Sequence, residues 1–235
     1  MSLSAGRDIV LQTTTLASRS ANGSSTQTSI DRIATLQGGT VTLDAARNIV
    51  AQGVSLAATG DLSASAGRDL TVSAVQGSYQ ISTATGGNVQ GRTGHIDERT
   101  TTNQVAALSA GRNATLGAQG DVSLIGANLS AAGDAYVQGA NVNVNAAKDR
   151  QAIDVQSVGA QRYNAAASVD ETLAGGRIEA GNNLSLVATG RIDANGNAVT
   201  GTGNLSLTGA ALTAGATASG LNLGGIYVSA RSPWL

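Results

Sequence analysis

Hydrophobic and polar residues alternate along this chain in short runs of three to five, a pattern typical of β-strands with one buried face. Each run follows a turn rich in Ala and Gly that ends in Asp or Asn. No apolar stripe of helical period lasts beyond two turns, so we expect no helix. The alternation predicts these buried pairs: Ile9/Leu11, Leu70/Val72, Val122/Leu124, Val142/Val144, Leu184/Leu186 and Leu205/Leu207.

The runs recur at a nearly constant spacing of 20 or 21 residues. Residues at the same place in successive runs are Ile49 and Leu70, Val41 and Leu62, Ala114 and Ala135, Val122 and Val142, and Leu184 and Leu205. A fixed period of this size indicates a solenoid, in which each coil stacks on the coil before it. We therefore expect an all-β solenoid with about 20–21 residues per coil, forming a single unit over residues 1–235.

Three polar segments interrupt this period, near residues 17–36, 76–107 and 149–173. They end alike, at Asp31, Asp97 and Asp170, and then return to the repeat. The second segment contains an alternating stretch before the turn signal Gly86-Gly87-Asn88. These features favour β-hairpins or extra strands over disorder. We expect the excursions to leave the coil and lie along the rod.

The composition is unsuited to a compact globular core. Aromatic residues make up 2% of the chain, Phe and Cys are absent, and 31 residues are Gly. The remaining apolar residues are mostly aliphatic, which suits a narrow layered interior. The net charge is −1 and the single Lys is Lys148, so there is no basic stripe for nucleic acid and we expect none to bind. Apolar runs are far shorter than a membrane span.

Two groups of residues deserve comparison with known kinds of site. The single histidine, His95, lies beside Asp97, Glu98 and Arg99, but one His without Cys is a poor start for a metal site. The column of turn residues Asp8, Asn48, Asp69, Asn113, Asp121, Asp134 and Asn183 lacks the nine-residue repeat of calcium-binding β-rolls. Such residues favour turns and can hydrogen-bond from coil to coil. We therefore assign no catalytic, cofactor-binding or metal-binding residue, and expect no cofactor.

Several phrases together resemble the haemagglutinin repeats of filamentous haemagglutinins and of contact-dependent growth inhibition exoproteins. They are Ala-Gly-Arg-Asp/Asn at residues 5–8, 66–69 and 110–113, Gly120-Asp121-Val122-Ser123-Leu124, and the run from Val142 to Asp149 that leads into a polar excursion. The resemblance implies a right-handed parallel β-helix that is part of a longer fibre. It also implies a secreted protein or one at the outer-membrane surface of a Gram-negative bacterium.

The same resemblance implies partners and a function. The partners are a two-partner outer-membrane transporter and a receptor on a host cell or a neighbouring bacterium. The function is that of a non-enzymatic shaft segment in adhesion or contact-dependent inhibition, and exposed strand edges favour end-to-end self-association of the chain. The alternative is a carbohydrate-active β-helix, a polysaccharide lyase or hydrolase or a phage tailspike, which would need paired carboxylates and aromatic residues that stack on sugars.

Overall fold

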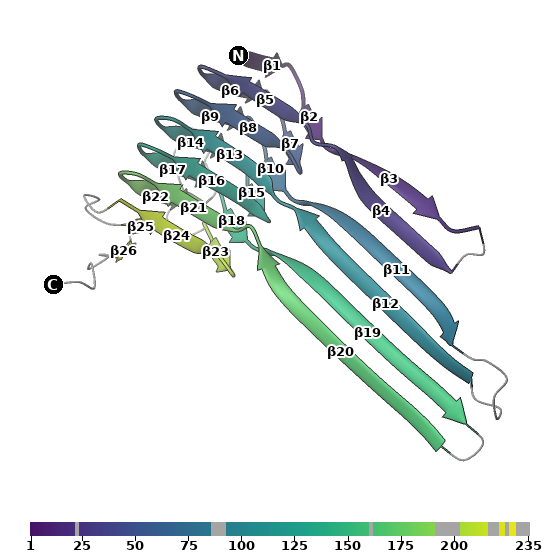
Figure 1. Ribbon diagram of the computed structural model, residues 1–235. Coiled ribbons are helices and arrows are strands. Elements are labelled where there is room, and N and C mark those ends of the chain that lie inside the picture. The colour runs from purple at the N-terminus through teal and green to yellow at the C-terminus, as the bar shows by residue number, and fades with distance from the viewer. Residues whose placement is uncertain are drawn as a thin grey trace.

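A computed structural model describes residues 1–21, 24–85, 93–159, 162–190, 203–215, 221–223 and 226–228 of the chain. Within these ranges the secondary structure consists of β-strands, with no helix. Three parallel sheets, here called A, B and D, wind into a solenoid, and an antiparallel sheet, here called the hairpin sheet, projects from its side (Figure 1). The expected parallel β-helix is confirmed.

Each coil contributes one strand to sheet A, one to sheet B and one to sheet D, in that order along the chain. Coil 1 consists of β1 (Ser2–Ala5), β2 (Ile9–Gln12) and β5 (Thr35–Gly38). Coil 2 consists of β6 (Val41–Ala45), β7 (Ile49–Gln52) and β8 (Ser55–Ala58). Coil 3 consists of β9 (Leu62–Ala66), β10 (Leu70–Ser73) and β13 (Ala106–Ala110). Coil 4 consists of β14 (Ala114–Ala118), β15 (Val122–Ile125) and β16 (Ala127–Ala131). Coil 5 consists of β17 (Ala135–Gly139), β18 (Val142–Asn145) and β21 (Arg177–Ala180). Coil 6 consists of β22 (Leu184–Ala188), β23 (Leu205–Thr208) and β24 (Ala211–Ala214). A seventh coil begins with β25 (Leu221–Leu223), against which β26 (Ile226–Val228) pairs antiparallel.

The core is a set of aliphatic columns that run through the coils. In sheet D, six stacked side chains form one such column: Leu36, Leu56, Leu108, Leu129, Ile178 and Leu212. In sheet B, Ile49, Leu70, Val122 and Val142 stack in the same way and are at most 1% exposed. Because every coil buries the same positions, the interior is narrow and continuous, as the composition predicted.

The sequence spacing identified four of five stacked pairs. Ile49 and Leu70, Val41 and Leu62, Ala114 and Ala135, and Val122 and Val142 are register partners. The fifth pair is wrong, because Leu184 stacks on Ala135 and Leu205 stacks on Val142. Leu184 and Leu205 belong to sheets A and B of the same coil, whose connection between these sheets is longer than in the other coils. The predicted pair Leu205/Leu207 is also not fully buried, since Leu207 is 40% exposed.

The three excursions are β-hairpins, which is one of the two forms expected from the sequence. Hairpin 1 consists of β3 (Thr14–Arg19) and β4 (Ser25–Arg32), hairpin 2 of β11 (Val75–Thr85) and β12 (Thr93–Gln104), and hairpin 3 of β19 (Ala147–Gly159) and β20 (Arg162–Ala174). The turn signal at residues 86–88 lies outside the described residues. All three hairpins leave the solenoid at the corner between sheets B and D.

The hairpins do not lie along the rod, which corrects the sequence-based expectation. They project away from the coils and pair with one another in the order β20-β19-β12-β11-β4-β3 (Figure 1). The reason is that β4 pairs with β11 and β12 with β19, so the outer backbone groups of each hairpin find partners in the next hairpin. The result is one antiparallel sheet beside the solenoid.

Hairpins occur in coils 1, 3 and 5, and this alternation follows from strand spacing. Hydrogen-bonded strands lie about 4.8 Å apart in any sheet. One hairpin is two strands wide, so it occupies about 9.6 Å, which equals the rise of two coils. A hairpin in every second coil therefore fills a continuous sheet without gaps or crowding.

In coils 2, 4 and 6, which carry no hairpin, the connection from sheet B to sheet D contains one glycine with a positive φ angle. Gly53, Gly126 and Gly209 have φ angles of 62°, 60° and 62°, a region that costs other residues about 1–2 kcal/mol. A Cβ atom on Gly126 would lie 2.7 Å from the Cβ of Ala147 and 2.8 Å from that of Ala74, residues at the bases of the neighbouring hairpins. Left-handed glycine thus provides both the tight turn and the space that the hairpins need.

We predict that Gly126→Ala destabilises the protein by about 1–2 kcal/mol from the backbone alone, with the close contacts adding to this cost. The matched control is Gly117→Ala, because a Cβ atom there meets nothing within 4 Å and φ is not positive. Urea denaturation followed by circular dichroism measures both variants. Equal unfolding free energies for the two variants would contradict the proposed role of the glycine corner.

Candidate functional site: the hairpin sheet

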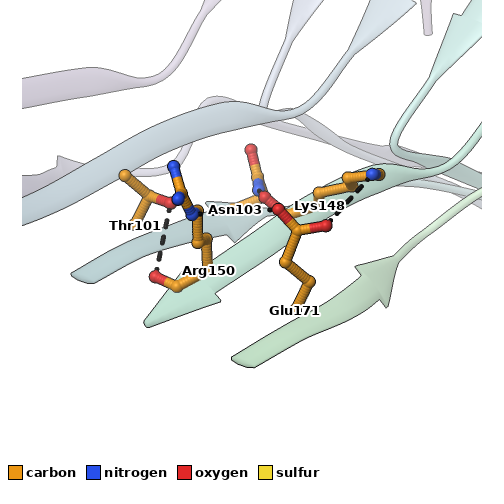
Figure 2. A network of polar contacts seen from close by, with 5 residues as sticks. All are labelled: Thr101, Asn103, Lys148, Arg150 and Glu171. Carbon is orange, nitrogen blue, oxygen red and sulfur yellow. Dashed lines mark hydrogen bonds and ion pairs between the residues drawn. The ribbon is translucent and has the colours of Figure 1, made fainter. Parts of the chain in front are cut away.

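Polar contacts join hairpins 2 and 3 where they leave the solenoid (Figure 2). The paired register of β12 and β19 ends at Thr101 and Arg150. Closer to the solenoid, the backbone N and the Nδ2 of Asn103 donate hydrogen bonds to Asp149 Oδ1, at 2.7 and 2.8 Å. The Nδ2 of Asn103 also donates to the carbonyl oxygen of Lys148, at 2.8 Å. The side chain of Asp149 thus replaces a backbone acceptor at the point where the two strands diverge.

A second set of contacts crosses from β19 to β20. Lys148 Nζ lies 3.1 Å from Glu171 Oε2, and Arg150 Nε lies 3.8 Å from Glu171 Oε1. All three side chains are largely exposed, so these ion pairs are screened by water and contribute little to stability. They place the Glu171 carboxylate beside two cations at the base of the sheet.

The structure divides the residues around His95 between two faces of the hairpin sheet. His95, Asp97 and Arg99 alternate along one face of β12, whereas Glu98 lies on the other face and accepts a hydrogen bond from Gln151. His95 Nε2 lies 3.0 Å from both Ser82 Oγ and Asp97 Oδ2. A Ser-His-Asp triad needs the serine and the aspartate on different ring nitrogens. This cluster therefore lacks the geometry of a catalytic triad.

A second carboxylate lies next to this cluster. Asp154 is the register partner of Asp97 across β12 and β19. A shallow groove on this face is lined by residues that include Gln80, Asp97, Arg99, Arg150, Asp154 and Val169. The sequence separation of Asp97 and Asp154 concealed this pair, since only hairpin-to-hairpin pairing brings them together. No group of three or more potential metal ligands occurs in the described part of the chain.

The Asp/Asn column of the sequence forms two columns, one at each of two corners. Before sheet B lie Asp8, Asn48, Asp69, Asp121, Asn141 and Asn204; before sheet A lie Asp61, Asn113, Asp134 and Asn183. In six of these residues the side-chain oxygen accepts a hydrogen bond from a backbone N of the next coil, for example from Asn48 N to Asp8 Oδ1 at 3.1 Å and from Asp134 N to Asn113 Oδ1 at 2.9 Å. Asp61, Asn141 and Asn204 were missed, although each directly precedes a strand.

Electrostatics distinguishes two of these carboxylates. At Asp61, a hydrogen bond from the Arg112 guanidinium and a second from the Asn113 backbone hold the pKa below its ordinary value of 3.8. At Asp8, desolvation opposes ionisation, but hydrogen bonds from Asn48 and the charges of Arg47 and Arg7 together lower the pKa. Asp61 also raises the pKa of Arg112, mainly through the same hydrogen bond. Asp8 and Asp61 therefore act in these columns as ionised acceptors.

We predict that the Asp61 interaction makes stability depend on acid pH. Because the folded pKa is lowered, its stabilisation is complete well above pH 3.8 and is lost as the pH falls through the folded value. Asp61→Asn keeps an oxygen acceptor for Asn113 but removes the charge, so it should be less stable than the parent protein at pH 7, and this difference should shrink as the pH falls below 3.8. Unfolding free energies at several pH values test this, with Asp44→Asn on the outer face of β6 as control. A difference that stays constant down to pH 2.5 would contradict the assignment.

Comparison with known proteins agrees with this architecture. Residues 77–160 match the model of the hemagglutinin repeat family. The match begins in β11 and includes all of β19, so it spans one interval from hairpin 2 to the first strand of hairpin 3. It confirms the resemblance to filamentous haemagglutinin repeats. No curated protein and no solved structure matches the chain. No helix in the described ranges has the length and hydropathy to cross a membrane.

Proposed function

We propose that this chain is a non-enzymatic shaft segment of a secreted or surface-displayed bacterial exoprotein that acts in adhesion or contact-dependent inhibition. The observation that carries the proposal is the hemagglutinin repeat at residues 77–160, placed on a solenoid with a continuous aliphatic core. Repeats of this kind suggest a filamentous haemagglutinin-like shaft.

The architecture suits a stiff spacer. Each coil is joined to the next by three parallel ladders and by side-chain columns, so bending the rod would break hydrogen bonds and open the core. The two Asp/Asn columns add contacts between coils at the corners. A rod of this construction holds a distal module away from the surface that carries it.

The hairpin sheet is the surface that we assign to recognition. It projects from one corner of the shaft and combines charged and hydroxyl side chains with exposed apolar ones such as Val155 and Val169. The proposed partners are a receptor on a host cell or neighbouring bacterium and, for export, an outer-membrane two-partner transporter of a Gram-negative cell. The resemblance to filamentous haemagglutinins supports both.

The alternative is a carbohydrate-active β-helix. The observation in its favour is the Asp97 and Asp154 pair in the groove of the hairpin sheet. Against it, none of the residues that line this groove is aromatic, and sugar-cleaving sites usually stack the substrate on aromatic rings. Turnover of polysaccharides that disappears in Asp97→Asn and Asp154→Asn would establish this alternative and overturn the shaft proposal.

We predict that removal of hairpin 2 weakens cell attachment while the solenoid stays folded. Coil 4 shows how to build the variant, because Gly126 alone joins Ile125 of β15 to Ala127 of β16. Residues 74–105 are replaced by one glycine, so that Ser73 and Ala106 are joined in the same way. We expect attachment to fall at least tenfold, with unchanged cooperative unfolding of the solenoid.

The matched control removes hairpin 1 by replacing residues 13–33 with one glycine. Loss of attachment with hairpin 2 but not hairpin 1 would place the adhesive surface around β11 and β12. Full attachment after both deletions would refute the role that we assign to the hairpin sheet.

A further inference from the structure

The two faces of the hairpin sheet carry different side chains in hairpins 2 and 3. Register partners of an antiparallel sheet lie on the same face, and successive residues of a strand alternate between the faces. One face, here called the aliphatic face, carries large apolar side chains, which are Tyr79, Ile81, Ile96, Ile153 and Val155. The opposite face, here called the charged face, carries the basic side chains that the structure describes in these two hairpins, which are His95, Arg99, Lys148 and Arg150.

The acidic residues of the two faces differ in their surroundings. On the charged face, Asp97 and Glu171 lie beside basic side chains. On the aliphatic face, Glu98 accepts a hydrogen bond from the neutral amide of Gln151, at 3.3 Å. Neither Glu98 nor Asp170, which lies on the same face, forms an ion pair with any side chain in the described part of the chain. The negative charge of the aliphatic face is therefore uncompensated.

The apolar side chains of the aliphatic face form one patch. Ile96 and Val155 are register partners, and Ile153 lies two residues from Val155 on the same strand. Val155 is 37% exposed and Tyr79 36%. Strands β11, β12 and β19 lie inside the hairpin sheet, so a further strand paired at either edge would leave the patch uncovered (Figure 1). Contiguous exposed apolar side chains of this kind mark interaction surfaces.

We propose that the aliphatic face binds a cationic amphipathic helix of a partner protein. The proposal specifies one face of the surface that we assign to recognition, and it rests on that assignment. Strands β11 and β19 flank β12, so they lie about 9.6 Å apart. A helix with its side chains is about 10–12 Å wide, so its apolar stripe can cover Ile81, Ile96 and Ile153 together. Lys or Arg side chains beside that stripe then meet Glu98 and Asp170.

Charge argues against two other occupants of the aliphatic face. The same face of a second copy would set the carboxylates of Glu98 and Asp170 close to their counterparts, and like charges brought together at an interface are unfavourable. The anionic surface of a lipid membrane would repel the same carboxylates. A segment that is both apolar and cationic matches the patch and the carboxylates together.

The experiment measures binding of a labelled peptide to the complete 235-residue chain by fluorescence anisotropy. The peptide, here called the Lys probe, has about 18 residues, or five helical turns. It consists of Leu and Lys, with Leu at the helical spacing i, i+3, i+4 and i+7. A matched Glu probe carries Glu in place of every Lys. We expect the Lys probe to bind at least tenfold more tightly than the Glu probe, and its affinity to fall as salt is added.

Two double variants test the charge and the apolar patch separately. Glu98→Gln/Asp170→Asn removes both carboxylates and keeps an oxygen acceptor for Gln151. Ile153→Thr/Val155→Thr removes apolar surface, while threonine retains the strand preference of a β-branched residue. Each double variant should weaken binding of the Lys probe at least tenfold. Circular dichroism checks that the variants keep their fold.

The matched control, Asp154→Asn/Val169→Thr, makes the same kinds of change on the charged face, where Val169 is 52% exposed. It should leave binding of the Lys probe unchanged. Equal binding of the two probes, no binding of either, or binding that survives both double variants would overturn the proposal. Co-sedimentation with phosphatidylcholine vesicles that Ile153→Thr/Val155→Thr abolishes would overturn it as well, in favour of a membrane surface.

Cell attachment separates this proposal from the function on which it rests. The two double variants of the aliphatic face should weaken attachment as removal of hairpin 2 does. If removal of hairpin 2 weakens attachment and these variants do not, the hairpin sheet binds its receptor elsewhere and only the present proposal fails. Full attachment after removal of hairpins 1 and 2 refutes the assigned function, whatever the probes show.

Discussion

The distance between hydrogen-bonded strands is the constraint on which this structure depends. The coils of the solenoid and the strands of the hairpin sheet share the spacing of about 4.8 Å, so two coils and one hairpin have the same width. A hairpin in every coil would need twice the available space, and one in every third coil would leave strand edges unpaired. When hairpins and left-handed glycines alternate at one corner, the strands of the solenoid and those of the hairpin sheet can both keep this spacing.

The two parts of the molecule are stabilised in different ways. The solenoid buries aliphatic columns on the inside of three sheets, and side chains such as Leu116 and Val137 are completely inaccessible. The hairpin sheet pairs its backbone groups mainly within itself, and its strands are mostly exposed or half-buried. Thr13 is an exception at the base of hairpin 1, where its buried hydroxyl donates to Gly53 O and accepts from Ala34 N. Hydrophobic burial therefore fixes the shaft, whereas ladder hydrogen bonds and cross-strand pairs hold the hairpins.

The repeat period and the alternation of Leu, Ile and Val were sufficient to predict the solenoid and most of its stacked pairs from the sequence. The polar segments break the period, so excursions were predicted as well, with β-hairpins as one of two expected forms. Their association was not, because the pairing of β4 with β11 and β12 with β19 depends on coil spacing, which no local pattern reports. The same holds for Asp97 and Asp154, which lie in different hairpins. In the sequence, Gly53, Gly126 and Gly209 resembled ordinary turn glycines, although each directly follows one of the alternating segments. The structure shows that these segments are the strands of sheet B.

The commensurate spacing also links the fold to the proposed function. Because the hairpins pair side by side, the side chains of equivalent strands repeat along the shaft at intervals of about 9.6 Å. A receptor that contacts one such strand weakly can contact several at once, and linked weak contacts bind much more tightly than single ones. A compact domain attached to a rod would offer one binding site. A sheet whose strands have the same spacing as the coils offers one binding site for each hairpin of the rod. The physical basis of adhesion in this proposal is thus the same spacing that orders the coils.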